Sequence, residues 1–244
     1  MVEIKECPVK KLLEHKPKKV LIVPDVHGFD FWKKNAYKQD YDEVVFLGDY
    51  VDEWHLTDEE IISNLTEIIE FKKQYPDKVT LLWGNHDVQY LYINRNIKCS
   101  GFRESYSAKL NEIFKRNNDL FKPIYRIDNV LFSHAGVSEA YARAVELYTG
   151  ISDPVDSITE AWSIRSPICF VASHVVGGRD QLSGFLWARP GELTRPLPGY
   201  IQVVGHTEAN VPEYLSDSRY YEYDENTSVM FVDNLPRRSL YMYI

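Results

Sequence analysis

Five short polar clusters, each directly after an apolar run, constrain the fold of this chain more than any other feature. The apolar runs have the length and composition of buried β-strands and cover residues 20–23, 44–47, 79–83, 130–132 and 200–204. The clusters that follow them are Asp25-Val26-His27-Gly28, Gly48-Asp49-Tyr50-Val51-Asp52, Gly84-Asn85-His86-Asp87, Ser133-His134-Ala135-Gly136 and Gly205-His206-Thr207. In layered α/β folds, the loops at the carboxyl ends of strands gather on one side of a sheet, so we expect the five clusters to converge on one cleft.

Each cluster carries a side chain that can bind a metal ion, and none of the five contains cysteine. Carboxylate and amide oxygens together with imidazole nitrogens suit hard and borderline divalent ions, which favours manganese, iron, zinc, magnesium or cobalt over a thiolate site. A carboxylate that bridges two ions holds them about 3.5–4 Å apart, a spacing suited to gripping the attacking and leaving oxygens of a phosphoryl transfer. Asp49 is the natural bridge.

The order D-x-H, G-D-x-x-D, G-N-H-D, a lone histidine and G-H-T resembles that of the calcineurin-like metallophosphoesterases. The G-D-Y-V-D cluster is similar to the phosphoprotein phosphatases and the bacterial or phage diadenosine tetraphosphatases. The resemblance runs from about residue 20 to the C-terminus. It implies an α/β fold in which a β-sandwich of two mixed sheets is flanked by helices, in four α/β/β/α layers. Periodicity alone indicates only mixed α and β structure.

The resemblance implies two divalent metal ions, manganese first, with iron, zinc, magnesium, cobalt or nickel as alternatives. The first ion would be held by Asp25, His27 and Asp49. The second ion would be held by Asp49, Asn85, His134 and His206. A metal-bound water or hydroxide, formed because the pKa of the bound water falls to about 7, would be the nucleophile, without a covalent enzyme intermediate.

The resemblance also identifies His86 as the general acid that donates a proton to the leaving oxygen, with Asp52 orienting its other ring nitrogen. The residues support this role, because His86 adjoins a metal ligand and an imidazole acid needs a carboxylate to fix its tautomer. Taken alone, Asp49 and Asp52 would be turn formers after a strand, His86 a helix N-terminal residue and His134 a core histidine. Five clusters in the family's order favour the functional interpretation.

The chain departs from the family pattern at Glu53, where many members of the branch carry an arginine that grips phosphate. An acid near a phosphate site weakens binding of dianionic substrates unless it points away or pairs with a base. We therefore expect other cations to bind phosphate: Arg189, in a Leu-Trp-Ala-Arg segment similar to a phosphate-side segment of the family, then Arg179 and Arg103. Each of these arginines also has an ordinary interpretation as a surface or salt-bridging residue.

Residues 1–244 are expected to form a single domain, with about 150–191 as loops and short helices over the cleft. A capping box at residues 57–60 and an apolar stripe predict a helix over about 58–75, and further helices are expected at 105–117 and 138–148. Apolar runs near 220–224, 228–233 and 239–243 are interpreted as antiparallel strands that close the second sheet.

Charge and composition narrow the functional class. A net charge of −8 argues against an extended nucleic-acid surface, which generally needs a basic face. Three cysteines without motif spacing indicate no disulfide framework and favour a reducing compartment. The chain has neither a signal-peptide apolar region nor an apolar run approaching the length of a membrane span, so no membrane association and a cytoplasmic location are expected.

The leading functional hypothesis is metal-dependent hydrolysis of phosphomonoesters, on phosphoprotein Ser/Thr or Tyr residues. The chemically close alternative is hydrolysis of a dinucleoside polyphosphate. An alternative of another class is a non-catalytic member that binds a phosphorylated ligand, and Glu53 is the one feature in its favour. The expected partner is a phosphorylated small molecule, nucleotide or phosphopeptide; no oligomeric state is predicted.

Overall fold

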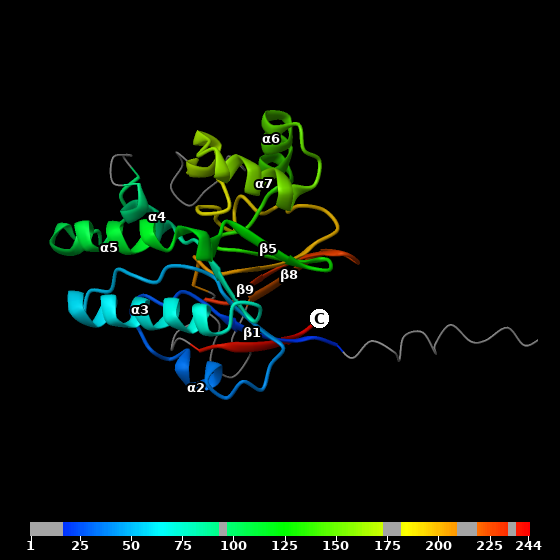
Figure 1. Cartoon of the computed structure of the whole chain (residues 1–244). Coiled ribbons are helices and arrows are strands. Elements are labelled where there is room, and N and C mark those ends of the chain that lie inside the picture. The colour runs from blue at the N-terminus through cyan, green and yellow to red at the C-terminus, as the bar shows by residue number, and fades with distance from the viewer. Residues whose placement is uncertain (1–16, 93–96, 173–181, 209–218, 234–237) are drawn as a thin grey trace, which may run out of the picture.

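The fold is seen in a computed structural model that describes residues 17–92, 97–172, 182–208, 219–233 and 238–244. Within these residues the strands form two five-stranded sheets (Figure 1). The first sheet has the order β10 (Leu240–Tyr243), β1 (Lys19–Val23), β2 (Glu43–Phe46), β3 (Val79–Leu82) and β4 (Phe121–Lys122). The second has the order β5 (Ile124–Ile127), β6 (Val130–Ser133), β7 (Ile201–Val204), β9 (Thr227–Phe231) and β8 (Arg219–Asp224).

Within each sheet, the strands that carry the five clusters run parallel to one another. Strands β1 to β4 pair in parallel, as do β6, β7 and β9, whereas β10, β5 and β8 are antiparallel edge strands. A buried layer that includes Val20, Val45 and Leu82 from the first sheet and Phe132 and Val203 from the second joins the two sheets. The two sheets therefore form a sandwich with the clusters at their strand ends.

The sequence interpretation of the C-terminal strands was partly wrong. Strands β8 and β9 are an antiparallel pair in the second sheet, as expected, but β9 lies parallel to β7. Strand β10 belongs to the first sheet, where it lies antiparallel to β1. Strand β10 alternates between Leu240 and Met242, which pack into the layer between the sheets, and Tyr241, which packs on the outer core. This alternation fits the open edge of either sheet, so the sequence pattern alone does not choose between them.

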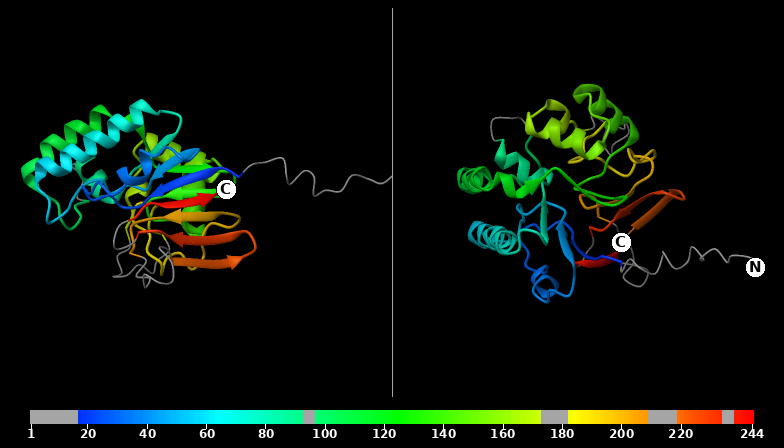
Figure 2. Two further views of the ribbon diagram at one scale, coloured as in Figure 1. Left: turned by 90° about the horizontal axis from the view of Figure 1, so that it is seen from below. Right: turned by 45° about the vertical axis from the view of Figure 1, so that its right-hand side comes forward.

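The three expected helices are confirmed as α3 (Asp58–Gln74), α5 (Glu104–Arg116) and α6 (Glu139–Thr149). Thr57 caps α3 and forms the capping box with Glu60. Shorter segments are α2 (Lys33–Ala36), α4 (Asn85–Leu91), η1 (Asn118–Leu120) and η2 (Pro167–Phe170). Figures 1 and 2 show α3 beside α5, away from the pair formed by α6 and α7 (Pro154–Ser163). None of the described helices has both the length and the apolar character of a membrane span.

Helix α7 begins where the sequence was interpreted as the start of an irregular segment. Asp153 is its N-cap, accepting hydrogen bonds from the backbone N–H groups of Val155 and Asp156, and Pro154 occupies the first turn. Proline suits this position because its fixed φ is helical and it has no N–H to satisfy. The helix packs against α6 and β5, on the outside of the second sheet.

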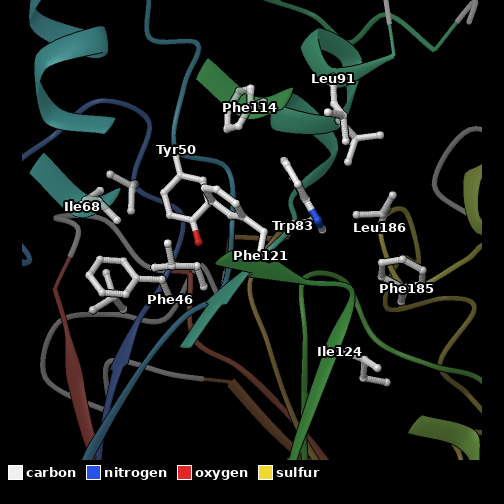
Figure 3. Close-up of a cluster of buried hydrophobic side chains, with 14 of the residues drawn as sticks. Phe46, Tyr50, Ile68, Trp83, Leu91, Phe114, Phe121, Ile124, Phe185 and Leu186 are labelled. Carbon is white, nitrogen blue, oxygen red and sulfur yellow. The ribbon is translucent and has the colours of Figure 1, made fainter. Parts of the chain in front are cut away.

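An aromatic core supports the loops that carry the polar clusters (Figure 3). Tyr50 and Trp83 are fully buried, and Trp83 stacks on Phe121 with ring centroids 4.5 Å apart. The Tyr50 hydroxyl donates to the Leu82 carbonyl at 3.0 Å. Because Tyr50 follows Asp49 directly and Trp83 precedes the Gly84-Asn85-His86 cluster, this packing fixes the starting points of two of the site loops.

Candidate metal centre and active site

All five clusters lie at the carboxyl ends of strands β1, β2, β3, β6 and β7, as expected. A cavity of about 500 Å³ opens there, and the described residues that line it are Asp25, His27, Asp49, Asn85, His86, Lys98, Cys99, Ser100, Trp187, Arg189, His206, Glu208 and Asp233. Within residues 150–191, therefore, Trp187 and Arg189 are the described residues that reach this cavity. His134 and Asp52 are buried beside it.

The backbone of the site is unusual, because four of its non-glycine residues have positive φ. These residues are His27 (45°), Asp49 (49°), Asp52 (69°) and His206 (62°). Two glycines allow the loops to approach one another. A Cβ at Gly84 would lie 2.2 Å from the Asp49 backbone nitrogen, and one at Gly205 would lie 2.2 Å from Asp25 Oδ1. The glycines of the clusters are therefore required by close contacts.

Asp25, His27 and Asp49 form one group whose potential ligand atoms all lie within 4.8 Å of one another. His27 Nδ1 lies 2.9 Å from the Val51 carbonyl and 3.0 Å from that of Asp52, so this nitrogen carries the proton. The unprotonated Nε2 lies 3.8 Å from Asp49 Oδ2. An imidazole lone pair and two carboxylates thus converge, which is a donor set that fits a divalent cation.

Asp49, His134 and His206 form a second such group, so Asp49 belongs to both. His134 Nδ1 donates to the Leu47 carbonyl at 2.9 Å, which leaves a lone pair on Nε2. This Nε2 lies 2.7 Å from Asn85 Oδ1, 3.1 Å from His206 Nδ1 and 3.4 Å from Asp49 Oδ2.

The protonation of the second group also fits a bound cation. Burial lowers the pKa of His134 and lowers that of His206 well below its usual value, so both rings are neutral near pH 7. The neutral His134 Nε2 and the carbonyl oxygen of Asn85 are both acceptors, and acceptors so close together need a positive charge between them. His206 Nε2 is buried without a hydrogen-bond partner. Burial raises the pKa of Asp49, but the histidines around it, when protonated, outweigh this and lower the pKa below the usual carboxyl value.

His86 and Asp52 form a hydrogen-bonded pair at the cavity wall, with His86 Nδ1 2.9 Å from Asp52 Oδ2. The His86 backbone N–H donates to Asp49 Oδ1 at 2.9 Å, which ties the pair to the shared carboxylate. Burial lowers the pKa of His86, but the charges of Asp49 and Asp52 and the hydrogen bond to Asp52 outweigh it and raise this pKa to about 9. Cations held by Asp49 would offset part of that charge. His86 also lies in the first turn of α4. It is therefore a helix N-terminal residue, as its local sequence indicates, and at the same time a residue of the cavity wall.

Several residues that support the site were missed in the sequence. Asp52 Oδ1 accepts from the hydroxyls of Tyr90 at 2.5 Å and Tyr106 at 2.8 Å, and Gln89 donates to Oδ2. Gln89 lies three residues after His86, a spacing that shares one face of a helix, so recognising α4 would have identified it. Tyr90, four residues after His86, shares this face by the same spacing, whereas Tyr106 carries no comparable sequence signal.

Asp87 is a further buried carboxylate that the sequence analysis did not assign. It accepts from the backbone N–H of Tyr50 at 2.8 Å and of Gly84 at 3.0 Å, and so fastens the β2 loop to the β3 loop. Burial and then the charge of Asp49 raise its pKa well above the usual value.

The three arginines proposed as phosphate ligands differ in their placement. Arg189 lines the cavity, and its Nη1 donates to the His206 carbonyl and to Thr207 Oγ1, each at 3.2 Å. Arg103 instead binds the Leu56 carbonyl at 3.0 Å and Asp58 at 2.9 Å. It is not among the described residues that line the cavity. Arg179 lies outside the described residues.

Glu53 turns toward its own loop. Its Oε1 accepts from the backbone N–H of Trp54 at 2.9 Å and of His55 at 3.3 Å. Its backbone carbonyl accepts from Arg103. Like Arg103, it is absent from the described lining of the cavity. The Glu53 carboxylate is thus engaged by backbone groups of its own loop.

Comparison with known proteins agrees with this geometry. A family model for the calcineurin-like phosphoesterases matches residues 18–227. The chain belongs to this family. The resemblance inferred from the five clusters is thereby confirmed, and Asp25 through His206 all lie within the matched region.

The family includes protein phosphatases that are partly similar to this chain. A putative serine/threonine-protein phosphatase of Schizosaccharomyces pombe is 30% identical over 124 residues, which cover 49% of this chain and 39% of that protein. Serine/threonine-protein phosphatase 5 of Rattus norvegicus is 28% identical over 155 residues, covering 56% of this chain and 29% of that protein. The chain thus spans less than half the length of these curated relatives.

Two solved structures share the fold. A cold-active protein tyrosine phosphatase superposes with a TM-score of 0.55 at 20% identity, over 89% of this chain and 70% of that one. A protein serine/threonine phosphatase from Saccharomyces cerevisiae gives a TM-score of 0.51 at 16% identity, over 89% and 67%. These structures confirm the expected sandwich of two mixed sheets flanked by helices.

Proposed function

We propose that this chain hydrolyses phosphomonoesters at the site centred on Asp49, and that its substrates are phosphorylated Ser/Thr or Tyr residues of proteins. The observation that carries the proposal is the sharing of Asp49 by two ligand groups beside the His86–Asp52 pair, in one cavity. Family membership supports the reaction class. The partly similar phosphatases support the substrate class.

Asp25, His27 and Asp49 would hold one divalent ion, and Asp49, Asn85, His134 and His206 a second, with manganese as our first choice. Ions held there supply the Lewis acidity that activates water and neutralises phosphate charge. Asp49 fixes the separation of the two groups because it is common to both.

The remaining roles belong to side chains of the cavity wall. His86 donates a proton to the leaving oxygen, and Asp52 holds the ring in the tautomer whose Nδ1–H points at the carboxylate. Arg189 binds phosphate oxygens with the part of its guanidinium that is not engaged by His206 and Thr207. Trp187, whose ring lies edge-on to that of His206 at 5.9 Å, forms a flat wall beside them.

The test compares His86→Asn with His55→Asn in manganese-loaded protein. His55 is an exposed histidine that lies outside the cavity lining, so it controls for the loss of an imidazole. We expect His86→Asn to keep its metal content and to lose about 10²–10⁴-fold in turnover on alkyl phosphates. Nitrophenyl phosphate, which has a good leaving group, should suffer less. Equal losses on both substrates, or loss of metal, would remove His86 from this role.

The same preparation separates the competing functions. Wild-type protein is assayed on Ser/Thr and Tyr phosphopeptides and on dinucleoside tetraphosphate. Faster turnover of the phosphopeptides supports the proposal, and faster turnover of the tetraphosphate replaces it with phosphoanhydride hydrolysis. Metal binding without turnover of either class would identify a non-catalytic phospho-ligand-binding protein.

A further inference from the structure

The orientation of the Asn85 side-chain amide decides whether Asn85 can join Asp49, His134 and His206 in holding a cation. Only Oδ1 can bind a metal ion, and it lies 2.7 Å from His134 Nε2. Because His134 donates its Nδ1–H to the Leu47 carbonyl, Nε2 presents a lone pair. An amide turned by 180° would donate an N–H to that lone pair. Before a cation binds, local electrostatics therefore favour the orientation that cannot bind metal.

Two contacts from Cys99 oppose this reversal. Asn85 Nδ2 donates to Cys99 Sγ at 3.2 Å, and the thiol in turn lies 3.4 Å from the Asn85 backbone carbonyl, to which it can donate. With the thiol hydrogen directed at the Asn85 backbone carbonyl, a reversed amide would place Oδ1 against a sulfur lone pair, where two acceptors would face each other. We infer that Cys99 is a positioning residue that keeps the carbonyl of Asn85 directed at the second cation.

Gln89 in turn holds the backbone of Cys99 in place. The Cys99 backbone N–H donates to Gln89 Oε1 at 2.8 Å, and Gln89 Nε2 donates to Asp52. Asp52 also accepts from the hydroxyls of Tyr90 and Tyr106, and the Cys99 N–H can only donate, so the Gln89 amide directs its NH₂ group at Asp52 and its carbonyl at Cys99. Gln89 thereby holds the Cys99 backbone in place beside Asn85. The His86–Asp52 pair is thus linked through Gln89 and Cys99 to Asn85 beside the second ligand group.

This inference rests on the proposed binding of two metal ions, and it is tested by metal affinity rather than by turnover. Both affinities are measured by calorimetric titration of metal-free protein with Mn²⁺, for wild type, Cys99→Ala and Cys99→Ser. Ser100→Ala is the control, since Ser100 is the next residue and lines the same cavity. Removing a group that orients a ligand typically costs 10–100-fold in metal affinity.

We expect Cys99→Ala to weaken one of the two sites by about 10–100-fold and to leave the other within about twofold. Cys99→Ser should recover most of the loss, because a hydroxyl also accepts and donates. Ser100→Ala should behave as wild type. Equal weakening of both sites, no weakening, or a serine variant as poor as the alanine variant would each overturn the inference.

A double-mutant cycle with Asn85→Ala tests whether Cys99 affects metal affinity through Asn85 or through a general effect on the structure. If Cys99 acts through Asn85, Cys99→Ala should add nothing to the loss of metal affinity already caused by Asn85→Ala. Additive losses would show that Cys99 acts by another route. Wild-type protein that binds fewer than two ions would instead refute the proposed metal centre, an outcome separate from failure of the Cys99 role.

Discussion

Replacing Asp52 with asparagine isolates the charge of this carboxylate from its geometry. Asparagine tolerates the φ of 69° at this position, so the backbone is not disturbed. The new NH₂ group can take the place of Oδ1, because the hydroxyls of Tyr90 and Tyr106 can rotate and accept from it. The remaining carbonyl still accepts from His86 and Gln89. The substitution therefore keeps the hydrogen bonds and removes the negative charge.

The expected shift in the pKa of His86 follows from the loss of this charge. A hydrogen bond to a charged group contributes about 1.5–3 kcal/mol and a neutral one about 0.5–1.5 kcal/mol, so the protonated form of His86 loses about 1–1.5 kcal/mol. This lowers the pKa of His86 by about one unit relative to that of the wild type. The general acid is the protonated form, which is present below its pKa. Activity that needs the acid should therefore decline at a pH about one unit lower in Asp52→Asn than in wild type.

The assay is the pH profile of kcat for an alkyl phosphate, measured from pH 6 to pH 10 with saturating manganese. Glu53→Gln is the control, because it removes a neighbouring carboxylate that accepts from the backbone of its own loop. The alkaline limb should shift for Asp52→Asn and stay in place for Glu53→Gln. An alkaline limb that does not shift in Asp52→Asn, or a loss of kcat as large as that of His86→Asn, would refute this role of the Asp52 charge.

Three further outcomes are expected. Asp49→Asn, which keeps the backbone at a φ of 49°, should weaken both metal sites together; one tight ion unaffected by the change, measured by elemental analysis, would contradict the bridge. Arg189→Ala should cost about 1.5–3 kcal/mol in kcat/KM, the scale of a hydrogen bond to a charged group, whereas an unchanged value would show that it does not bind phosphate. Glu53→Arg should lower KM for nitrophenyl phosphate, and an unchanged or raised KM would show that the position lies out of reach of the substrate.

The sequence predicted the location of the site because its signals are local. A buried parallel strand is a short apolar run, and the residues just after it must lie at one edge of the sheet. Helix α3 was predictable for the same kind of reason, since Thr57 and Glu60 form a capping box within four residues. The interpretation failed where the deciding partner is distant in sequence, as it is for β10, whose partner β1 lies at the other end of the described chain.

The residues that support the site were not predicted from the sequence, for a related reason. Asp52 is contacted by Tyr106, which is 54 positions away along the chain, and nothing in the local sequence of α5 distinguishes this tyrosine from one that only packs. The proposed roles of Gln89 and Cys99 likewise depend on the orientation of side-chain amide groups. Such contacts depend on how loops are placed against one another, and the hydrophobic period does not encode that placement.

The residues with positive φ in the loops of the site are held in place by hydrogen bonds between those loops. Each such residue costs of order 1–3 kcal/mol, so four of them persist only because neighbouring groups hold them. The Asp49 carbonyl accepts from the backbone N–H of Val26 at 3.0 Å and of His27 at 2.7 Å, while its carboxylate accepts from that of His86. Asp25 holds the backbone of His206 in the same way, at 3.1 Å. The hydrogen bonds of Asp25 and Asp49 thus fasten the loops to one another and help to hold the strained geometry.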